Sequence, residues 1–188
     1  MSGKSREIIE VLADVVKATA ENCTIVVEDG KEMNCPTINY TFGSALYVKE
    51  RLDELSQTPK GNEMKFPLIA LFVPLKENRN NPDYYTQAKV NVLIAVSTLQ
   101  QYSNEERLVK SFQNKLRPIY RRFLDELEAD ERIETGYRTN IPHEYSENYS
   151  YGRYGAHTGT GDAVSESIDA INLTNLEIKI INKNCRSI

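Results

Sequence analysis

The chain is poor in the residues that reaction centres and covalent scaffolds need. Its 188 residues include no tryptophan, two histidines and three cysteines. Because Cys23, Cys35 and Cys185 are scattered and odd in number, they exclude a disulfide-built fold and are typical of reduced thiols in a cytosolic protein. A Cys23–Cys35 disulfide is the less favoured alternative. The spacing of cysteines and histidines does not suit zinc or haem, so we expect no metal and no cofactor.

The chain also lacks long apolar runs and a strong excess of one charge. No run reaches the roughly 18 residues that a membrane-spanning helix needs. The N-terminus MSGKSREIIEVL becomes amphipathic and acidic at once, unlike a signal peptide. The net charge of −4 gives no chain-wide reason to bind nucleic acid. We therefore expect no membrane partner and no specific nucleic acid, and a role in the cytoplasm or in a particle assembled there.

Two apolar runs lie at the centre of the chain. Phe66–Val73 (FPLIALFV) and Val90–Val96 (VNVLIAV) predict strands that are covered on both faces, or on the second face by a partner subunit. The polar stretch KENRNNPDYYTQ between them predicts a long hairpin loop within residues 74–89. A loop of about a dozen residues is more typical of interfaces than of minimal connections.

A long amphipathic helix is predicted from Ser103 to Ala129. Ser103 and Glu106 form a capping box, and Pro118 should bend the helix near its middle. Its apolar stripe comprises Val109, Phe112, Leu116, Ile119, Phe123 and Leu127. Two shorter helices are predicted over residues 4–22, with Ser5 as N-cap, and over residues 44–57.

The remaining regular segments read as strands. Thr24–Asp29 is followed by Gly30 and predicts a hairpin whose second strand lies near Pro36–Tyr40. In Ser167–Asn182 the apolar alternation changes parity at Thr174 and Asn175, which predicts a bulge. We therefore expect one α+β domain over residues 1–188, with a mostly antiparallel sheet backed by the N-terminal helix and the long helix.

Residues 135–165 have no periodicity. The run from Gly136 to Asp162 holds five of the eleven tyrosines, five of the nine glycines and both histidines. A structureless loop of this length is unusual inside a compact domain, and the segment is too aromatic for an ordinary linker. Since tyrosine gives large contact area at low entropic cost, we interpret the segment as an extended arm that orders against another chain.

No stretch of the chain carries a recognisable catalytic motif. His143 and His157 both lie in the arm, away from any strand-to-helix elbow, so we interpret them as exposed or interface residues. The glycine-rich HTGTGD that begins at His157 does not open an apolar helix and is interpreted as a turn. Lys115, Arg117, Arg121 and Arg122 make the middle of the long helix basic, which could serve nucleic acid but is better explained by a solvated face or ion pairs between subunits.

The order of elements resembles the tail-terminator and head–tail joining proteins of tailed bacteriophages. The likeness rests on FPLIALFVPL, AKVNVLIAVST, SNEERLVKSFQNKLRPIYRRFLDEL and the terminal DAINLTNLEIKI. It covers about two thirds of the chain, mostly residues 66–129 and 167–182, and is a likeness of pattern rather than of one motif. The arm at 135–165 is longer than the family pattern implies.

The resemblance implies a non-enzymatic subunit of a closed ring, a hexamer or dodecamer, at the neck of a virion. Its partners would be copies of itself and the portal, connector and tail proteins, with DNA passing nearby in a channel. The residues that we expect at protein interfaces are Tyr145, Tyr149, Tyr151, Tyr154, Arg153, Tyr84, Tyr85, Arg117 and Arg121. Two alternatives stay open: an enzyme or ligand-binding domain with 135–165 as a lid near the histidines, and a nucleic-acid-binding accessory factor.

Overall fold

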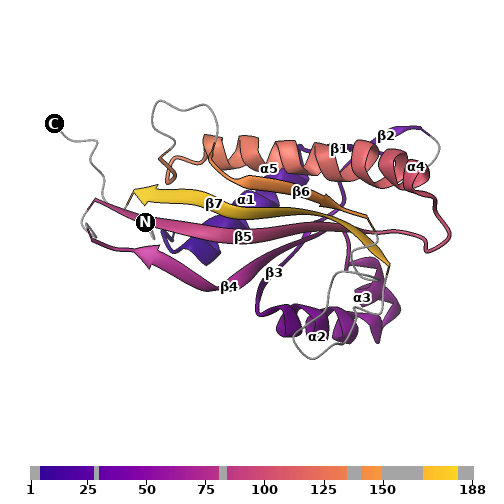
Figure 1. Cartoon of the computed structure of the whole chain (residues 1–188), viewed down its shortest axis with the longest axis horizontal. Helices are drawn as coiled ribbons and strands as arrows, with labels where there is room; N and C mark the ends of the chain where they lie inside the picture. Colours follow the sequence, from indigo (N-terminus) through magenta and orange to yellow (C-terminus); the bar gives the residue numbers. More distant parts are fainter. Residues whose placement is uncertain (1–4, 28–29, 81–83, 135–140, 150–166, 182–188) are drawn as a thin grey trace.

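The computed structural model describes residues 5–27, 30–80, 84–134, 141–149 and 167–181. It confirms the α+β class: a mixed five-stranded sheet of order β3-β4-β5-β7-β6 lies beside a two-stranded hairpin, β1-β2 (Figure 1). The strands are β1 Thr24–Val26, β2 Glu32–Asn34, β3 Asn39–Gly43, β4 Leu68–Asn78, β5 Tyr85–Ser97, β6 Glu144–Asn148 and β7 Ile168–Ile181. The helices are α1 Ile8–Asn22, α2 Ala45–Ser56, α3 Pro59–Glu63, α4 Asn104–Arg107, η1 Leu108–Leu116 and α5 Arg117–Ala129.

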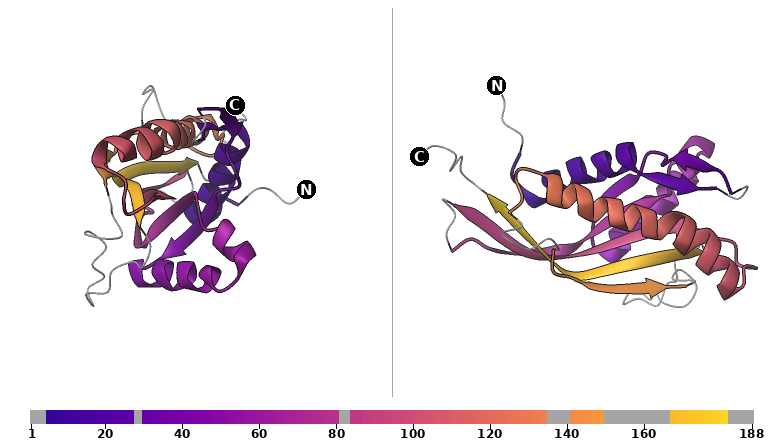
Figure 2. Two further views of the ribbon diagram at one scale, coloured as in Figure 1. Left: turned by 90° about the vertical axis from the view of Figure 1, so that its right-hand side faces the viewer. Right: turned by 90° about the horizontal axis from the view of Figure 1, so that it is seen from above.

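Helices cover both faces of the sheet, but unequally. Figure 2 shows α1 and the long helix α4–η1–α5 on one side, and α2 with α3 on the other. The larger core lies under the long helix, where Phe112, Ile119 and Phe123 are fully buried. A smaller core joins α2 to β4 and β5 through Val48, Leu52 and their neighbours. This coverage confirms the prediction drawn from the two apolar runs.

The expected long hairpin loop is wrong, because β4 and β5 continue well beyond their apolar centres. Strand β4 runs to Asn78 and β5 starts at Tyr85, so only residues 79–84 connect them. In this outer part of β5, every second residue is buried: Thr86, Ala88 and Val90. Between them Gln87 is half-buried and Lys89 is exposed. The polar residues that suggested a loop therefore form one face of the amphipathic ribbon made by the outer parts of β4 and β5.

The N-terminal hairpin exists, but its second strand is not the one expected. Thr24 pairs with Asn34, and the Cys35 N–H donates to the Cys23 carbonyl, 2.8 Å away, where the hairpin ends. The next extended segment, β3, leaves the hairpin and pairs in parallel with β4, beginning where the Asn39 N–H donates to the Pro67 carbonyl. The expected return near Pro36–Tyr40 is therefore wrong, and β3 forms an edge of the main sheet.

The long helix begins as predicted, with both hydrogen bonds of the Ser103–Glu106 capping box present. Over Leu108–Leu116 it adopts wider π-helical turns, and the Arg117 N–H bonds to the Phe112 carbonyl, five residues back. The wider turn shifts the buried face, so Val109 is 47 % exposed rather than part of the apolar stripe. Ser5 is likewise not an N-cap: α1 starts after Glu7, which makes no side-chain cap hydrogen bond.

Strand β7 contains the bulge that its parity change predicted. Val90 pairs with Leu176 and Val92 with Leu173, so two residues of β7 oppose one of β5. Asn175 has φ of 54°, and its N–H bonds to the Asn91 side chain.

Among the helices of the described ranges, none combines the length and the apolar character that a membrane crossing requires.

The prediction of an extended arm that orders only against another chain is wrong for residues 144–148. These residues form β6, which pairs with β7 in antiparallel register from Glu144↔Thr174 to Asn148↔Ala170. The rest of the segment, residues 135–140 and 150–166, lies outside the described residues.

Candidate interaction site

Strand β6 is fixed to the long helix by an ion pair between Arg117 and Glu147. The guanidinium donates two hydrogen bonds, Nε to Oε1 at 2.7 Å and Nη2 to Oε2 at 3.1 Å. The pair is partly shielded from solvent, and the Arg117 hydrogen bonds hold the pKa of Glu147 below its usual range. Two of the predicted interface segments are therefore joined to each other within one subunit.

Aromatic contacts beside this ion pair complete the junction. The Tyr120 hydroxyl and His143 Nε2 are 2.8 Å apart, and His143 Nδ1 lies 2.7 Å from the Ile141 carbonyl. Because a carbonyl only accepts, Nδ1 carries a proton, and in the neutral imidazole Tyr120 therefore donates to Nε2. The Tyr120 and Tyr145 rings lie 4.9 Å apart between centroids. His143 thus serves the attachment of β6.

The predicted tyrosines on and after β6 fall into three groups. Tyr149 packs on Phe112 with ring centroids 4.3 Å apart, so it faces its own core. Tyr145 remains 41 % exposed, while its hydroxyl donates to Glu147; desolvation is the main reason that its pKa is raised. Three further residues of the predicted interface lie outside the described residues: Tyr151, Arg153 and Tyr154. The same holds for His157 and Cys185.

The other predicted residues are not brought together with β6. Tyr84 is 55 % exposed in the β4–β5 turn, and Tyr85 lies at the start of β5 with the Lys179 ammonium 4.1 Å from its ring centroid. Arg121 is exposed on α5. Since Arg117 is bound to Glu147 and Arg122 lies 3.8 Å from Glu126, the middle of the helix does not present a continuous basic surface.

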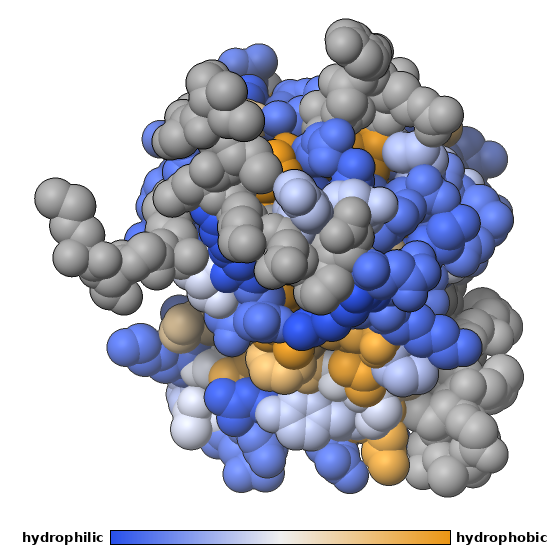
Figure 3. All heavy atoms as spheres, turned by 90° about the vertical axis from the view of Figure 1, so that its left-hand side faces the viewer, coloured by the Kyte–Doolittle hydropathy of each residue, from blue (hydrophilic) through white to orange (hydrophobic). Residues whose placement is uncertain are grey.

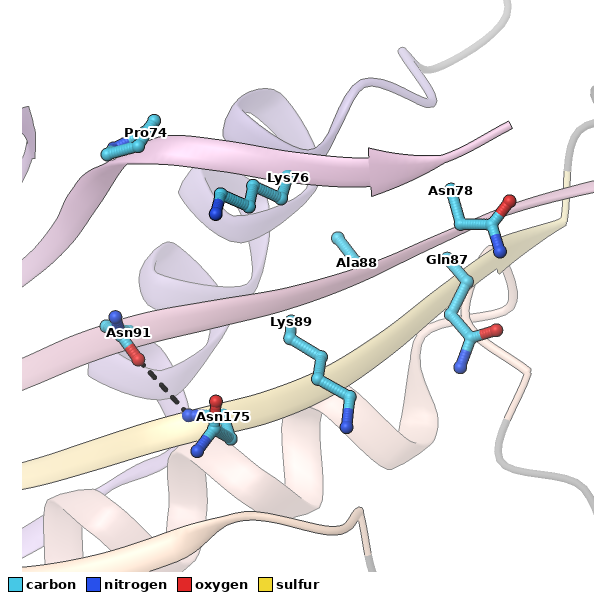
Figure 4. Close-up of a pocket in the computed structure, with 8 residues that line it drawn as sticks. All are labelled: Pro74, Lys76, Asn78, Gln87, Ala88, Lys89, Asn91 and Asn175. Atoms are coloured by element: carbon cyan, nitrogen blue, oxygen red, sulfur yellow. Dashed lines mark hydrogen bonds between the residues drawn. The ribbon is translucent and has the colours of Figure 1, made fainter. Parts of the chain in front are cut away.

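An open concavity of about 630 Å³, lined mostly by polar side chains, lies on the same face of the sheet as α2 and α3, over the part that these helices do not cover (Figure 4). Lys76 and Lys89 are directly opposite each other across β4 and β5. Lys89 is paired with Glu177 at 2.8 Å, and Lys179 with Glu134 at 2.8 Å. Most of the positive charge on this face is therefore already neutralised, which argues against an anion site.

Several buried charges escaped the sequence analysis. Arg107 is 3 % exposed and donates to Asp169 at 2.9 Å and to the Leu99 carbonyl at 2.8 Å. Lys65 is 1 % exposed beside a cavity of about 490 Å³, and burial lowers its pKa. Arg132 is buried against Asp130 and Asp14. Arg107 and Arg132 each have a partner far away in the sequence, and the burial of Lys65 is set by packing. No local pattern therefore marks these three residues as buried.

The β3 edge is a surface that the sequence did not reveal, because the extended segment predicted near Pro36–Tyr40 was placed in the N-terminal hairpin and not at the edge of the main sheet. Phe42 is 44 % exposed on β3, and Leu46 and Tyr47, in the first turn of α2, are 44 % and 52 % exposed. Val73 on the neighbouring strand is 40 % exposed. Figure 3 shows apolar side chains gathered in the lower half of the molecule, at the height of β3, β4 and α2 in Figure 1. The alternation of Ile38, Tyr40 and Phe42 was the available signal for a strand here.

A groove of about 300 Å³ runs beside the same edge. Residues 37–41 form one side, and Arg51 and Leu55 of α2, with Met64, form the other. Met64 is 52 % exposed. An edge strand next to a groove whose lining mixes polar and apolar side chains with one cation can receive an extended chain.

The described residues contain no group of three or more histidine, cysteine or acidic side chains that could hold a metal ion. Cys23 and Cys35 are free and buried, and the pKa of Cys35 is raised because its thiol donates a hydrogen bond to Cys23 and is desolvated.

No protein-family model matches the chain, and no curated protein is significantly similar to it.

Proposed function

We propose that the protein is a non-enzymatic structural subunit that assembles into a closed ring at the portal–tail junction of a tailed bacteriophage. The observation that carries the proposal is the sheet itself. Within the described residues β3 pairs only with β4, and β6 pairs only with β7, so this part of the chain leaves both edges of the five-stranded sheet without a second pairing strand. A subunit with different contact surfaces on its two sides forms heterologous contacts, which close into a ring when the rotation allows.

The order of elements supports the same proposal. A central antiparallel pair, a long helix lying over the sheet and a bent terminal strand follow the pattern of the tail-terminator and head–tail joining proteins. The exposed apolar side chains at β3 suit a surface that is covered in an assembly. Copies of the chain, and portal or tail proteins, would be the partners.

The test is to purify the full chain and measure its mass by sedimentation velocity over a wide concentration range, with negative-stain imaging of each species. We expect rings of one diameter at high concentration. A chain that stays monomeric throughout, alone and with its candidate partners, would overturn the proposal. Genes for portal and capsid proteins beside its own would support it.

A lid over an active site would make a different prediction. His143, the described histidine, is held by Tyr120 at β6, and the three cavities described above are lined from other elements. Thermal-shift screening with nucleotides and divalent metals discriminates the two functions, since a ligand that binds the folded chain raises its midpoint. We expect no shift.

A further inference from the structure

We infer that the β3 edge of one copy is the docking site for the β6 edge of the next copy, so that the two sheets continue into one another. This inference rests on the proposed function and specifies the contact that would build the ring. It commits to a second copy of this chain as the occupant of the groove beside β3.

The backbone of β3 is ready for such pairing. Because the Asn39 N–H bonds to the Pro67 carbonyl, Asn39, Thr41 and Gly43 face β4, and the N–H and C=O groups of Tyr40 and Phe42 point away from it. The strand has no proline, bulge or charged residue, which are the usual means of blocking an edge. Its outer groups are thus a template for another strand.

The two edges match in length and direction. Strands β3 and β6 both have five residues. Strand β3 is parallel to β4, and β4-β5, β5-β7 and β7-β6 are each antiparallel, so β6 runs opposite to β3. When subunits follow one another with their sheets aligned, β6 of one copy therefore meets β3 of the next in antiparallel orientation.

The side chains on the helix-covered face also match. Tyr40 donates from its hydroxyl to the Ile9 carbonyl of α1, so Tyr40 and Phe42 lie on this face. Tyr145 lies there too, against Tyr120 of the long helix. Continuing the sheet would bring the exposed Tyr145 of one copy beside Tyr40 and Phe42 of the next, and aromatic pairs across strands are favourable.

On the opposite face the charges are complementary. Arg51 borders the groove and is about half exposed, with its guanidinium donating to Glu54 of the same helix at 2.7 Å, so a neighbouring carboxylate would add a second partner. Glu144 at the start of β6 is exposed on the face away from the long helix, where it bonds to Thr174 and Asn175. An antiparallel register that places residues 144–148 along residues 39–43 keeps this carboxylate on the Arg51 side of the sheet and puts Tyr145 opposite Phe42 on the aromatic side.

The first test compares sedimentation of the wild-type chain with Phe42→Lys. A lysine at this position puts a charge on the edge strand, and charged edge residues oppose pairing with another strand. We therefore expect association to weaken by about tenfold or more. The matched control is Val109→Lys, because Val109 is similarly exposed but lies on the long helix. Phe42→Lys that associates as tightly as wild type would overturn the inference and leave the ring proposal intact. A wild-type chain that never associates would overturn both.

The second test identifies the neighbours directly. In a Cys185→Ser background, Phe42→Cys and Tyr145→Cys chains are mixed and treated with a short bismaleimide. The two positions lie on opposite edges of one sheet, about 19 Å apart at four strand spacings, so a short link between them must join two copies. We expect mixed dimers from this pair and none from Phe42→Cys with Val109→Cys. Equal yields from both mixtures would overturn the inference.

Discussion

Arg117 and Glu147, 30 positions apart, meet in a two-hydrogen-bond ion pair that holds the edge strand β6 to the long helix. The same helix contacts β6 through Tyr120 and Tyr145. Beyond its ladder with β7, the attachment of β6 to the long helix therefore depends on one charged pair and a few rings, rather than on a continuous apolar core. If β6 is the surface offered to a neighbouring copy, this pair also controls how firmly that surface is held.

The first prediction concerns acid. Because the folded pKa of Glu147 is lowered, its stabilising effect is fully present above its unfolded pKa, about 4.3, and is lost as the pH falls through the lower folded value. Glu147→Gln should cost about 1–2 kcal/mol of unfolding free energy at pH 7, and this cost should shrink as the pH is lowered below the unfolded pKa. Urea unfolding at a series of pH values from 7 downward measures the change. A cost that is independent of pH would contradict the role of the charge.

The parts of the fold that followed from the sequence are those fixed by local patterns. The capping box at Ser103 and Glu106 lies within one helical turn, and the bulge at Thr174 and Asn175 appears as a change in alternation along one strand. The buried centres of β4 and β5 are short apolar runs. In each of these places the residues that decide the structure are close together in the chain.

The parts that the sequence did not reveal depend on distant partners. Strand β6 reads EYSEN, which has no apolar alternation, and it becomes a strand because β7 offers an edge and the long helix offers Arg117. Arg107 looks like a surface residue of a first helical turn until Asp169, 62 positions away, is placed beside it. The β3 edge was assigned to the hairpin because Pro36–Tyr40 was taken as the strand that returns after the Asp29-Gly30 turn signal, while the short β2 went unrecognised.

The second prediction concerns Arg107. Replacing it with alanine leaves the Asp169 carboxylate buried without its cation and removes the hydrogen bonds to the 99–102 turn. We expect Arg107→Ala to lower the free energy of unfolding by about 3–5 kcal/mol, measured in urea. Arg51→Ala is the control, since the Arg51–Glu54 pair is exposed and should contribute less than about 0.5 kcal/mol. Equal losses in the two variants would contradict a special role for the buried pair.

The third prediction concerns Gly61 in α3. A Cβ atom at this position would lie 2.4 Å from the Leu55 carbonyl oxygen, which belongs to the backbone and cannot move aside cheaply. Gly61→Ala should therefore lower the unfolding free energy by about 1–3 kcal/mol.

Gly30→Ala is the comparison for Gly61→Ala, because Gly30 has φ of 73° but nothing within 4 Å of its Cβ position. It should cost only the backbone strain, about 1 kcal/mol. Thermal unfolding of the two variants beside wild type measures both effects. A Gly61→Ala variant as stable as wild type would show that the turn after α2 can open without cost.

The last prediction concerns Cys23 and Cys35, which are 4 % and 8 % exposed and lie opposite each other at the end of the β1–β2 hairpin. In a Cys185→Ser background, both thiols should react with a disulfide reagent only after local opening, on the order of a hundredfold more slowly than in urea. A Val109→Cys chain in the same background supplies one exposed thiol as the control and should react at once. Fast reaction of the native thiols would mean that the hairpin does not bury them in the core that α1 and the long helix share.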